Sequence, residues 1–260
     1  MTASLPDLAA RARILAVTSG KGGVGKTFIS ANLAAALARR GLKVLVLDAD
    51  LGLANLDVVL NLHPKVTLHD VFTGQAELEQ AVLPAPGGFS VLLAGSGLVE
   101  YSRLTPEVRE QLLAVIEQVA PRYDIVLLDT GAGISDVVLY TVSLAGEVLV
   151  VVTPEPTSMT DAYATIKVLA TQQERRELRL VVNQVPRAGD GKGVAVQLQQ
   201  VVDRFVAPSV GAPVKLGLLG DVPLDPAVRE AVKKRQLIVE SLPGTAAAQA
   251  IAALAARLNP

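Results

Sequence analysis

Residues 20–27 have the types and spacing needed to hold a chain of phosphates. They read Gly-Lys-Gly-Gly-Val-Gly-Lys-Thr and fit the pattern G-x-x-x-x-G-K-[ST]. Glycines let a backbone curl so that several N–H groups point at one anion, and the start of a helix adds positive potential. The lysine of the pattern reaches the β- and γ-phosphates, and the hydroxyl after it can ligate Mg²⁺. The stretch predicts a phosphate site made of Gly20, Lys21, Gly22, Gly23, Val24, Gly25, Lys26, Thr27 and Phe28, with Thr27 as a metal ligand.

The flanking residues supply the elements that such a loop needs. The apolar run at 14–18 has the composition of a buried strand, and 29–40 has the spacing of a helix that ends near Gly41. A strand, a glycine-rich loop and a helix start, in this order, distinguish a phosphate-binding loop from a chance match.

Acidic residues end two other predicted strands. Asp48 and Asp50 follow one apolar run, and Asp129 follows another. An aspartate that ends a strand beside a phosphate loop holds the shell of a bound Mg²⁺, which is the role predicted for Asp129. Asp48 is predicted to join that metal shell or to shape its loop, and the alternative for both Asp48 and Asp50 is that they cap turns. Gly131 lies in the loop after Asp129 and can place an N–H on the γ-phosphate.

The residues that would read the base follow a later strand. Guanine-specific proteins with this phosphate loop carry N-K-x-D after a strand, whereas this chain has Asn183-Gln184-Val185-Pro186, without that aspartate. The sequence therefore predicts adenine as the base. The alternative for Asn183 is a turn residue.

Short aliphatic runs alternate with stretches of helical spacing along the chain. Such alternation is typical of an α/β fold with a mostly parallel central sheet and helices on both faces. Ligands of such folds bind at the carboxyl ends of the strands, where the glycines and acids named above fall. Because no linker divides the sequence, 14–260 is predicted to form a single domain after a lead-in at 1–13. Strands are predicted at 14–18, 43–47, 89–93, 124–128, 147–152, 178–182 and 214–219, with 61–87 irregular.

Composition sets limits on function. None of the 260 residues is cysteine, which excludes disulfides, thiolate metal sites and cysteine nucleophiles. The formal net charge of −1 shows no basic excess, so DNA binding is not expected. The first 13 residues lack the apolar core of a signal peptide, and no apolar run approaches the roughly 20 residues of a membrane span. These features favour a cytoplasmic protein.

The octet G-K-G-G-V-G-K-T, with its second lysine at Lys21, resembles the deviant Walker A loop of the MinD/ParA family of ATPases. The stretches D-T-G-A-G-I-S from Asp129 and L-G-L-A-N-L-D from Leu51 resemble the switch segments of that family, and of its FlhG (FleN)/MinD-like branch most. The resemblance covers 14–258. It implies a P-loop ATPase that binds ATP or ADP with Mg²⁺ and forms an ATP-dependent homodimer, in which Lys21 contacts the partner's nucleotide.

The same resemblance implies roles for further residues. Asp50 corresponds to the catalytic aspartate of the family, and Lys21 and Lys26 are the other catalytic residues that it implies. The adenine side is implied to include Asn183, Pro223 and Asp225.

The function implied is a slow, partner-stimulated ATPase that controls the placement or number of flagella or of another polar machine. Its partner would be a protein that reads the ATP state, either part of that machinery or a transcription regulator. Division-site placement of the MinD type and DNA or cargo segregation of the ParA type remain alternatives. In a different class, an ATP-dependent ligase of the dethiobiotin-synthetase type remains open.

One residue and two segments are compared with the family separately. Phe28 stands where the family has a small polar residue, which removes a hydroxyl contact to the α-phosphate but keeps the backbone N–H. The segment 7–13 loosely resembles the D-Q-A-x-x-L-R activator motif of FlhG-type proteins, and the alternative is a frayed helix. The last predicted helix carries a narrow stripe of Ile251, Leu254 and Leu258, which suits docking on the domain. No intrinsic membrane anchor is therefore predicted, so that recruitment to a pole or membrane would need a protein partner.

Overall fold

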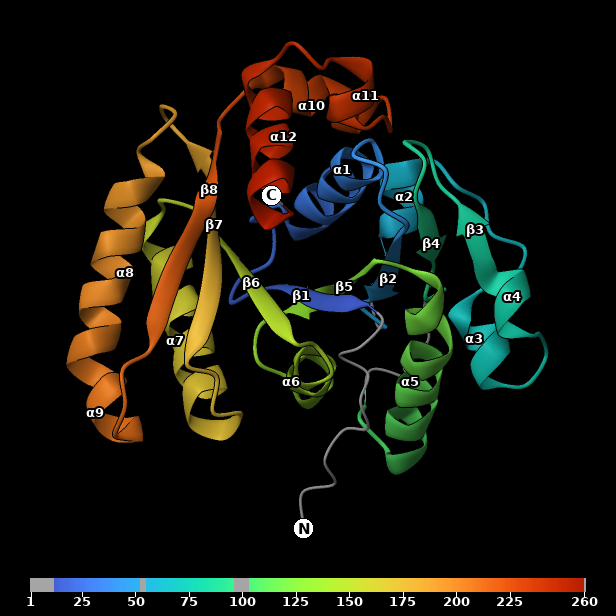
Figure 1. The fold of residues 1–260 in the computed structure, drawn as a ribbon, viewed down its shortest axis with the longest axis horizontal. Helices are drawn as coiled ribbons and strands as arrows, with labels where there is room; N and C mark the ends of the chain where they lie inside the picture. The colour runs from blue at the N-terminus through green and yellow to red at the C-terminus, as the bar shows by residue number, and fades with distance from the viewer. Residues whose placement is uncertain (1–11, 52–54, 96–102, 260) are drawn as a thin grey trace.

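Strands from most of the chain pair into one sheet (Figure 1). This computed structural model describes residues 12–51, 55–95 and 103–259. The strand order is β3-β4-β2-β5-β1-β6-β7-β8, and the pairs are parallel except for the antiparallel β3–β4 pair at one edge. The predicted α/β fold with a mostly parallel sheet is confirmed. The strands are β1 (Arg13–Ser19), β2 (Val44–Ala49), β3 (Val82–Pro84), β4 (Ser90–Leu92), β5 (Ile125–Ala132), β6 (Glu147–Val152), β7 (Glu177–Val185) and β8 (Lys215–Pro223).

Helices cover both faces of the sheet, as the sequence predicts (Figure 1). One layer consists of α1 (Lys26–Ala38), α2 (Leu56–Leu60), α10 (Pro226–Lys233), α11 (Ile238–Ser241) and α12 (Ala246–Leu258). The other consists of α3 (Leu68–Phe72), α4 (Leu78–Ala81), α5 (Pro106–Val119) with the 3₁₀ turn η3 (Ala120–Arg122), α6 (Asp136–Ser143), α7 (Pro156–Gln172), α8 (Gly191–Phe205) and α9 (Ala207–Val210).

Each helix layer closes a core of its own against the sheet. Ile14 and Ala16 of β1 enter the core beneath α5–α8, and Leu15 and Val17 enter the core beneath α1 and α12. A strand that is buried on both faces reads as a continuous apolar run, which is why the period-two alternation of a half-buried strand is missing from β1.

The strands run further toward their carboxyl ends than the sequence indicated. Asp48 and Asp129 lie inside β2 and β5 and are paired in register, and Asn183 lies inside β7. The apolar runs end before these residues, but backbone pairing with the neighbouring strands continues past them. The polar side chains are thereby held by the sheet itself rather than by loops.

The prediction that 61–87 is irregular is wrong in part. The segment contains α3, α4 and the edge strand β3. Capping boxes start the two short helices, one between Thr67 and Asp70 and one between Glu77 and Gln80. Because each of these elements has at most five residues, the hydrophobic period that reveals longer helices and strands does not develop.

The helix after the glycine-rich loop ends as the sequence predicts. Gly41 has φ 87°, and its N–H donates to the carbonyl of Ala38. The N–H of Leu42 donates to the carbonyl of Leu37, which completes a Schellman motif.

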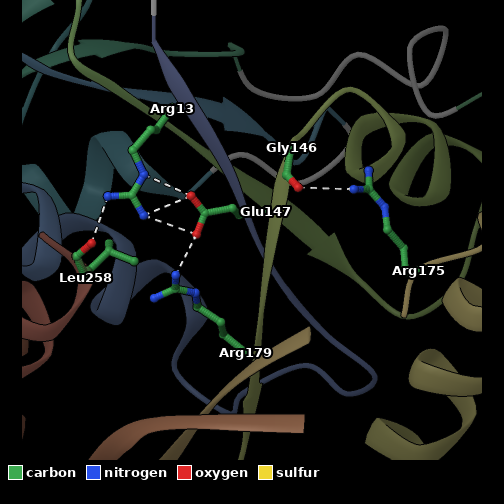
Figure 2. Close-up of polar contacts among 6 residues, drawn as sticks. All are labelled: Arg13, Gly146, Glu147, Arg175, Arg179 and Leu258. Carbon is green, nitrogen blue, oxygen red and sulfur yellow. Dashed lines mark hydrogen bonds and ion pairs between the residues drawn. The ribbon is translucent and has the colours of Figure 1, made fainter. Parts of the chain in front are cut away.

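Charged side chains tie the strands together at their amino ends. Figure 2 shows Glu147 of β6 between Arg13 of β1 and Arg179 of β7. Nη1 of Arg13 also donates to the carbonyl of Leu258 at 2.7 Å, so that β1 is joined to the end of α12. Arg13, which the sequence assigned to the lead-in, is thus the first residue of β1. Residues 1–11 of the lead-in, which include most of the activator-like segment, lie outside the described residues.

The last helix docks on the domain, as its narrow stripe predicts. Ile251, Leu254 and Leu258 of α12 are all at most 2% exposed. Within the part of the chain that the structure describes, none of the helices has the length and apolar character needed to cross a membrane.

Candidate functional site

The glycine-rich loop joins β1 to α1 and contains two left-handed residues. Gly23 and Gly25 have φ of 79° and 94°, which residues with a β-carbon rarely adopt, and Gly25 is the N-cap of α1. A β-carbon on Gly20 would lie 2.1 Å from the carbonyl oxygen of Asp161 in α7. One on Gly25 would lie 2.4 Å from Nδ2 of Asn183. The two ends of the loop are therefore clamped between α7 and β7.

A buried pair of opposite charges lies beneath this loop. Lys26 is 9% exposed and Asp129 is 2% exposed. Oγ of Ser30 donates to the Asp129 carboxylate at 2.8 Å, and the hydroxyl of Thr27 lies near the same carboxylate. Burial raises the pKa of Asp129 to about 6, although the two hydroxyls and Lys26 counteract the shift. Burial also lowers the pKa of Lys26, against the attraction of Asp129 and Asp50.

Asp48 holds the segment that follows β2. Its Oδ1 accepts from the N–H of Asp50 at 3.2 Å and its Oδ2 from the N–H of Leu56 at 3.4 Å. Burial, together with the charge of Asp129, raises the pKa of Asp48 well above its usual range. These contacts hold the backbone after β2, and the metal role of Asp48 stays a prediction.

A cavity, here called the phosphate cavity, opens between the loop and the ends of β2 and β5. Its volume is about 630 Å³, within the range of small-molecule sites. Asp50 lines this cavity, and a β-carbon on Gly131 would lie 3.4 Å from its Oδ1. The lining residues are Gly22, Gly23, Gly25, Lys26, Thr27, Phe28, Ala49, Asp50, Leu51, Asn55, Thr130, Gly131, Ala132, Ser135, Val137 and Val138.

A second cavity, of about 590 Å³, lies at the carboxyl ends of β7 and β8. Asn183, Pro223 and Asp225, the three residues predicted on the adenine side, all line it. Most of its other walls are apolar, and they are formed by Gly25, Phe28, Gln184, Leu224, Pro226, Val228, Arg229 and Val232. An apolar slot with a few polar groups suits a flat heterocyclic base.

Asn183 is hydrogen-bonded to the glycine-rich loop. Its Nδ2 donates to the carbonyl of Val24 at 2.8 Å, and its Oδ1 accepts from the N–H of Gln184 at 3.0 Å. A carboxamide nitrogen carries two N–H groups, so the bond to Val24 leaves one for a ligand. Both carboxylate oxygens of Asp225 accept backbone N–H groups, from Ala227 at 2.9 Å and from Ala247 at 3.2 Å. This side chain therefore positions the starts of α10 and α12.

Lys21 reaches from the loop to the start of α7. Its Nζ donates to Oγ1 of Thr157 at 2.9 Å and lies 3.4 Å from Oε2 of Glu155. Its side chain is 40% exposed, so the pair with Glu155 is weak and can open.

The sequence missed several residues that the fold brings to this site. Ser30 bonds Asp129, and Glu155 and Thr157 hold Lys21. Each of these contacts joins residues about a hundred or more positions apart, and a lone Ser, Glu or Thr in a helix start carries no signal for them. Three residues of the predicted switch run from Leu51, at 52–54, lie outside the described residues.

The side chains at this site provide few ligands for a metal ion. Among the described residues, no group of three or more His, Cys, Asp or Glu side chains is arranged to hold a metal by itself. Mg²⁺ keeps several waters and takes one or two protein ligands together with phosphate oxygens. The hydroxyl of Thr27 beside the carboxylate of Asp129 fits such an ion, carried in with a polyphosphate, and does not fit a protein-only cage.

Comparisons with known proteins agree with this geometry. The ParA family model, described as NUBPL iron-transfer P-loop NTPase, matches residues 11–259. The chain is 42% identical to the antiactivator FleN of Pseudomonas aeruginosa over 95% of this chain and 86% of FleN. It is 32% identical to the flagellum site-determining protein YlxH of Helicobacter pylori, over 95% and 81% of the two chains. The structure of the septum site-determining protein MinD of Pyrococcus horikoshii, complexed with Mg-ADP, superposes with a TM-score of 0.76 at 30% identity, covering 95% and 96% of the two chains.

The chain therefore belongs to the ParA/MinD family of P-loop NTPases. The resemblance found in the loop and switch residues is confirmed, and the Mg-nucleotide expected for the family is the ligand of the P. horikoshii relative. The iron-transfer description of the family model has no counterpart in this chain, since its sequence contains no cysteine for an iron–sulfur cluster.

Proposed function

We propose that this protein is an ATP-operated dimerisation switch that controls the placement or number of flagella or of another polar machine. The observation that supports it most is the P-loop with its second lysine, Lys21, and with Asp50 in the lining of the same cavity as the loop, in a chain 42% identical to FleN. The ATP state would be read by a protein partner of the flagellar or polar machinery, or by a transcription regulator.

The chemistry proposed for the site is hydrolysis of ATP to ADP and phosphate. Lys26 would bind the β- and γ-phosphates, and Thr27 with Asp129 would hold the Mg²⁺ that accompanies them. Asp50 would orient a water for in-line attack on the γ-phosphorus, while the bond to the bridging oxygen breaks and ADP leaves. The N–H of Gly131 would bind the γ-phosphate and lose its partner when phosphate departs, which couples the reaction to the loop.

Lys21 is proposed to link hydrolysis to assembly. In the single chain its ammonium group rests on Thr157 and Glu155. To contact the nucleotide of a second copy it must leave both, and the negative charge of ATP there would compensate for the lost pair. Dimerisation would therefore need the nucleotide and would end after its hydrolysis.

ATP with Mg²⁺ is expected to convert the protein from monomer to dimer, and ADP is not. Sedimentation velocity at micromolar concentrations measures this. Lys21→Ala should abolish the dimer while ATP still binds, because its ammonium group serves the partner's site. Lys26→Ala should weaken ATP binding itself, and Lys192→Ala, an exposed lysine of α8, should behave as the wild type. A wild-type chain that stays monomeric with ATP would refute the switch.

ATP is expected to bind at least about tenfold more tightly than GTP. Asn183 lines the apolar cavity, and the carboxylate that recognises guanine in N-K-x-D is missing. Competition of ATP and GTP for a fluorescent ATP analogue tests this preference. Equal affinities would contradict the assignment of Asn183, Pro223 and Asp225 to an adenine site.

Two other functions are compatible with the same residues. Division-site placement is supported by the likeness to the P. horikoshii MinD structure, and a pull-down with ATP-locked protein would distinguish its partners from flagellar ones. An ATP-dependent ligase would release phosphate only when an acceptor molecule is present. Phosphate release from ATP and water alone, slow and faster with the partner, is the result expected here.

A further inference from the structure

The phosphate cavity and the base cavity meet at two residues. Gly25 and Phe28 are the residues that appear in the lining of both. A nucleotide that fills the two cavities must pass this junction with its ribose and α-phosphate, since these groups connect the base to the β- and γ-phosphates. Gly25 has no side chain, so the ring of Phe28 is the side chain that this part of the ligand meets.

Phe28 is held at the junction by its surroundings. Its ring is half-buried and packs against the core on the α1 side of the sheet. Its carbonyl accepts from Nδ2 of Asn32 at 2.9 Å, and Oδ1 of Asn32 accepts from the N–H of Val239 in α11 at 3.3 Å. The start of α1 is thereby fixed to α11, and Phe28 is held in the lining of both cavities.

We propose that Phe28 makes tight binding depend on the nucleoside part of the ligand, by giving the ribose an apolar surface at the junction. This inference rests on the proposed function, because it takes the ligand to be an adenine nucleotide. A phenyl ring offers no hydrogen bond to a phosphate but can bury the carbon face of a sugar. Phe28 contributes nothing to the β- and γ-phosphates, which the loop backbone and Lys26 hold.

The test compares ligands with and without a nucleoside. Dissociation constants are measured by calorimetry for Mg-ATP, Mg-ADP and Mg-tripolyphosphate, with wild type, Phe28→Ala and Phe28→Leu. Phe28→Ala is expected to weaken ATP and ADP by the same factor, about tenfold, and to leave tripolyphosphate unchanged. Phe28→Leu, which keeps an apolar volume against the core, should lie between the two. Phe205→Ala removes a ring that is 53% exposed on α8 and should change none of the three.

Each other result overturns the proposal in a distinguishable way. An equal loss for tripolyphosphate in both Phe28 variants would show that the ring supports the loop rather than the ribose. Unchanged nucleotide affinity in Phe28→Ala would show that the ring makes no contact with the ligand. A wild-type chain that binds tripolyphosphate but neither nucleotide would overturn the proposed function, and this inference with it.

Discussion

Replacing Asp50 by alanine is expected to slow phosphate release by about 10²–10³-fold and to leave ATP binding nearly unchanged. Asp50 lines the phosphate cavity, and a β-carbon on Gly131 would approach its carboxylate to 3.4 Å. In the proposed mechanism Asp50 acts on the attacking water, whereas the loop backbone and Lys26 bind the phosphates. Losing the group that orients the water should remove hydrolysis and spare binding.

Asp50→Ala is also expected to change the oligomeric state of the protein. If hydrolysis dissolves the dimer, a chain that binds ATP without cleaving it should accumulate as dimer, and sedimentation with ATP should show it. Asp50→Asn keeps the shape of the side chain and should behave like the alanine variant, because the charge is what is lost. Asp203→Ala changes a distant exposed acid of α8 and serves as the control. Wild-type phosphate release from Asp50→Ala would remove Asp50 from the mechanism.

The loop and its context could be predicted from the sequence because local rules determine them. Glycine spacing, the lysine, the preceding apolar run and the helix end at Gly41 each act within a few residues. The meeting of Asp48 with Asp129 was also accessible in outline, since both end strands of a parallel sheet. Their pairing in adjacent, register-matched positions was not, because strand order is set by packing over the whole chain.

Contacts between segments far apart in the sequence could not be predicted from it. Ser30 reaches Asp129 across 99 positions, and Lys21 reaches Thr157 across 136. Serine at the start of a helix is otherwise an ordinary solvent-facing or capping residue. The sequence identified Phe28 as a departure from the family. It could not show that Phe28 lines both cavities, because that depends on the shapes of the cavities.

Gly20→Ala is expected to destabilise the protein by about 3 kcal/mol. The added β-carbon would lie 2.1 Å from the carbonyl oxygen of Asp161 and 2.8 Å from its β-carbon, distances at which one chain must move. The carbonyl of Asp161 is a backbone group inside α7 and cannot rotate away as a side chain could. The neighbouring Ala162 and Ile166 are fully buried, so a shift of α7 would open its core.

Gly20→Ala is expected to affect ATP binding as well as the stability of the fold. If the loop moves instead of α7, Lys21 is drawn away from Thr157 and the backbone N–H groups of the loop no longer point at one phosphate. Gly20→Ala should therefore also bind ATP more weakly. Gly22→Ala is the matched control for stability, since nothing lies within 4 Å of its β-carbon and its backbone is not left-handed. Urea denaturation with Mg-ATP titration measures both effects. Equal stability of the two alanine variants would mean that α7 does not confine the first glycine of the loop.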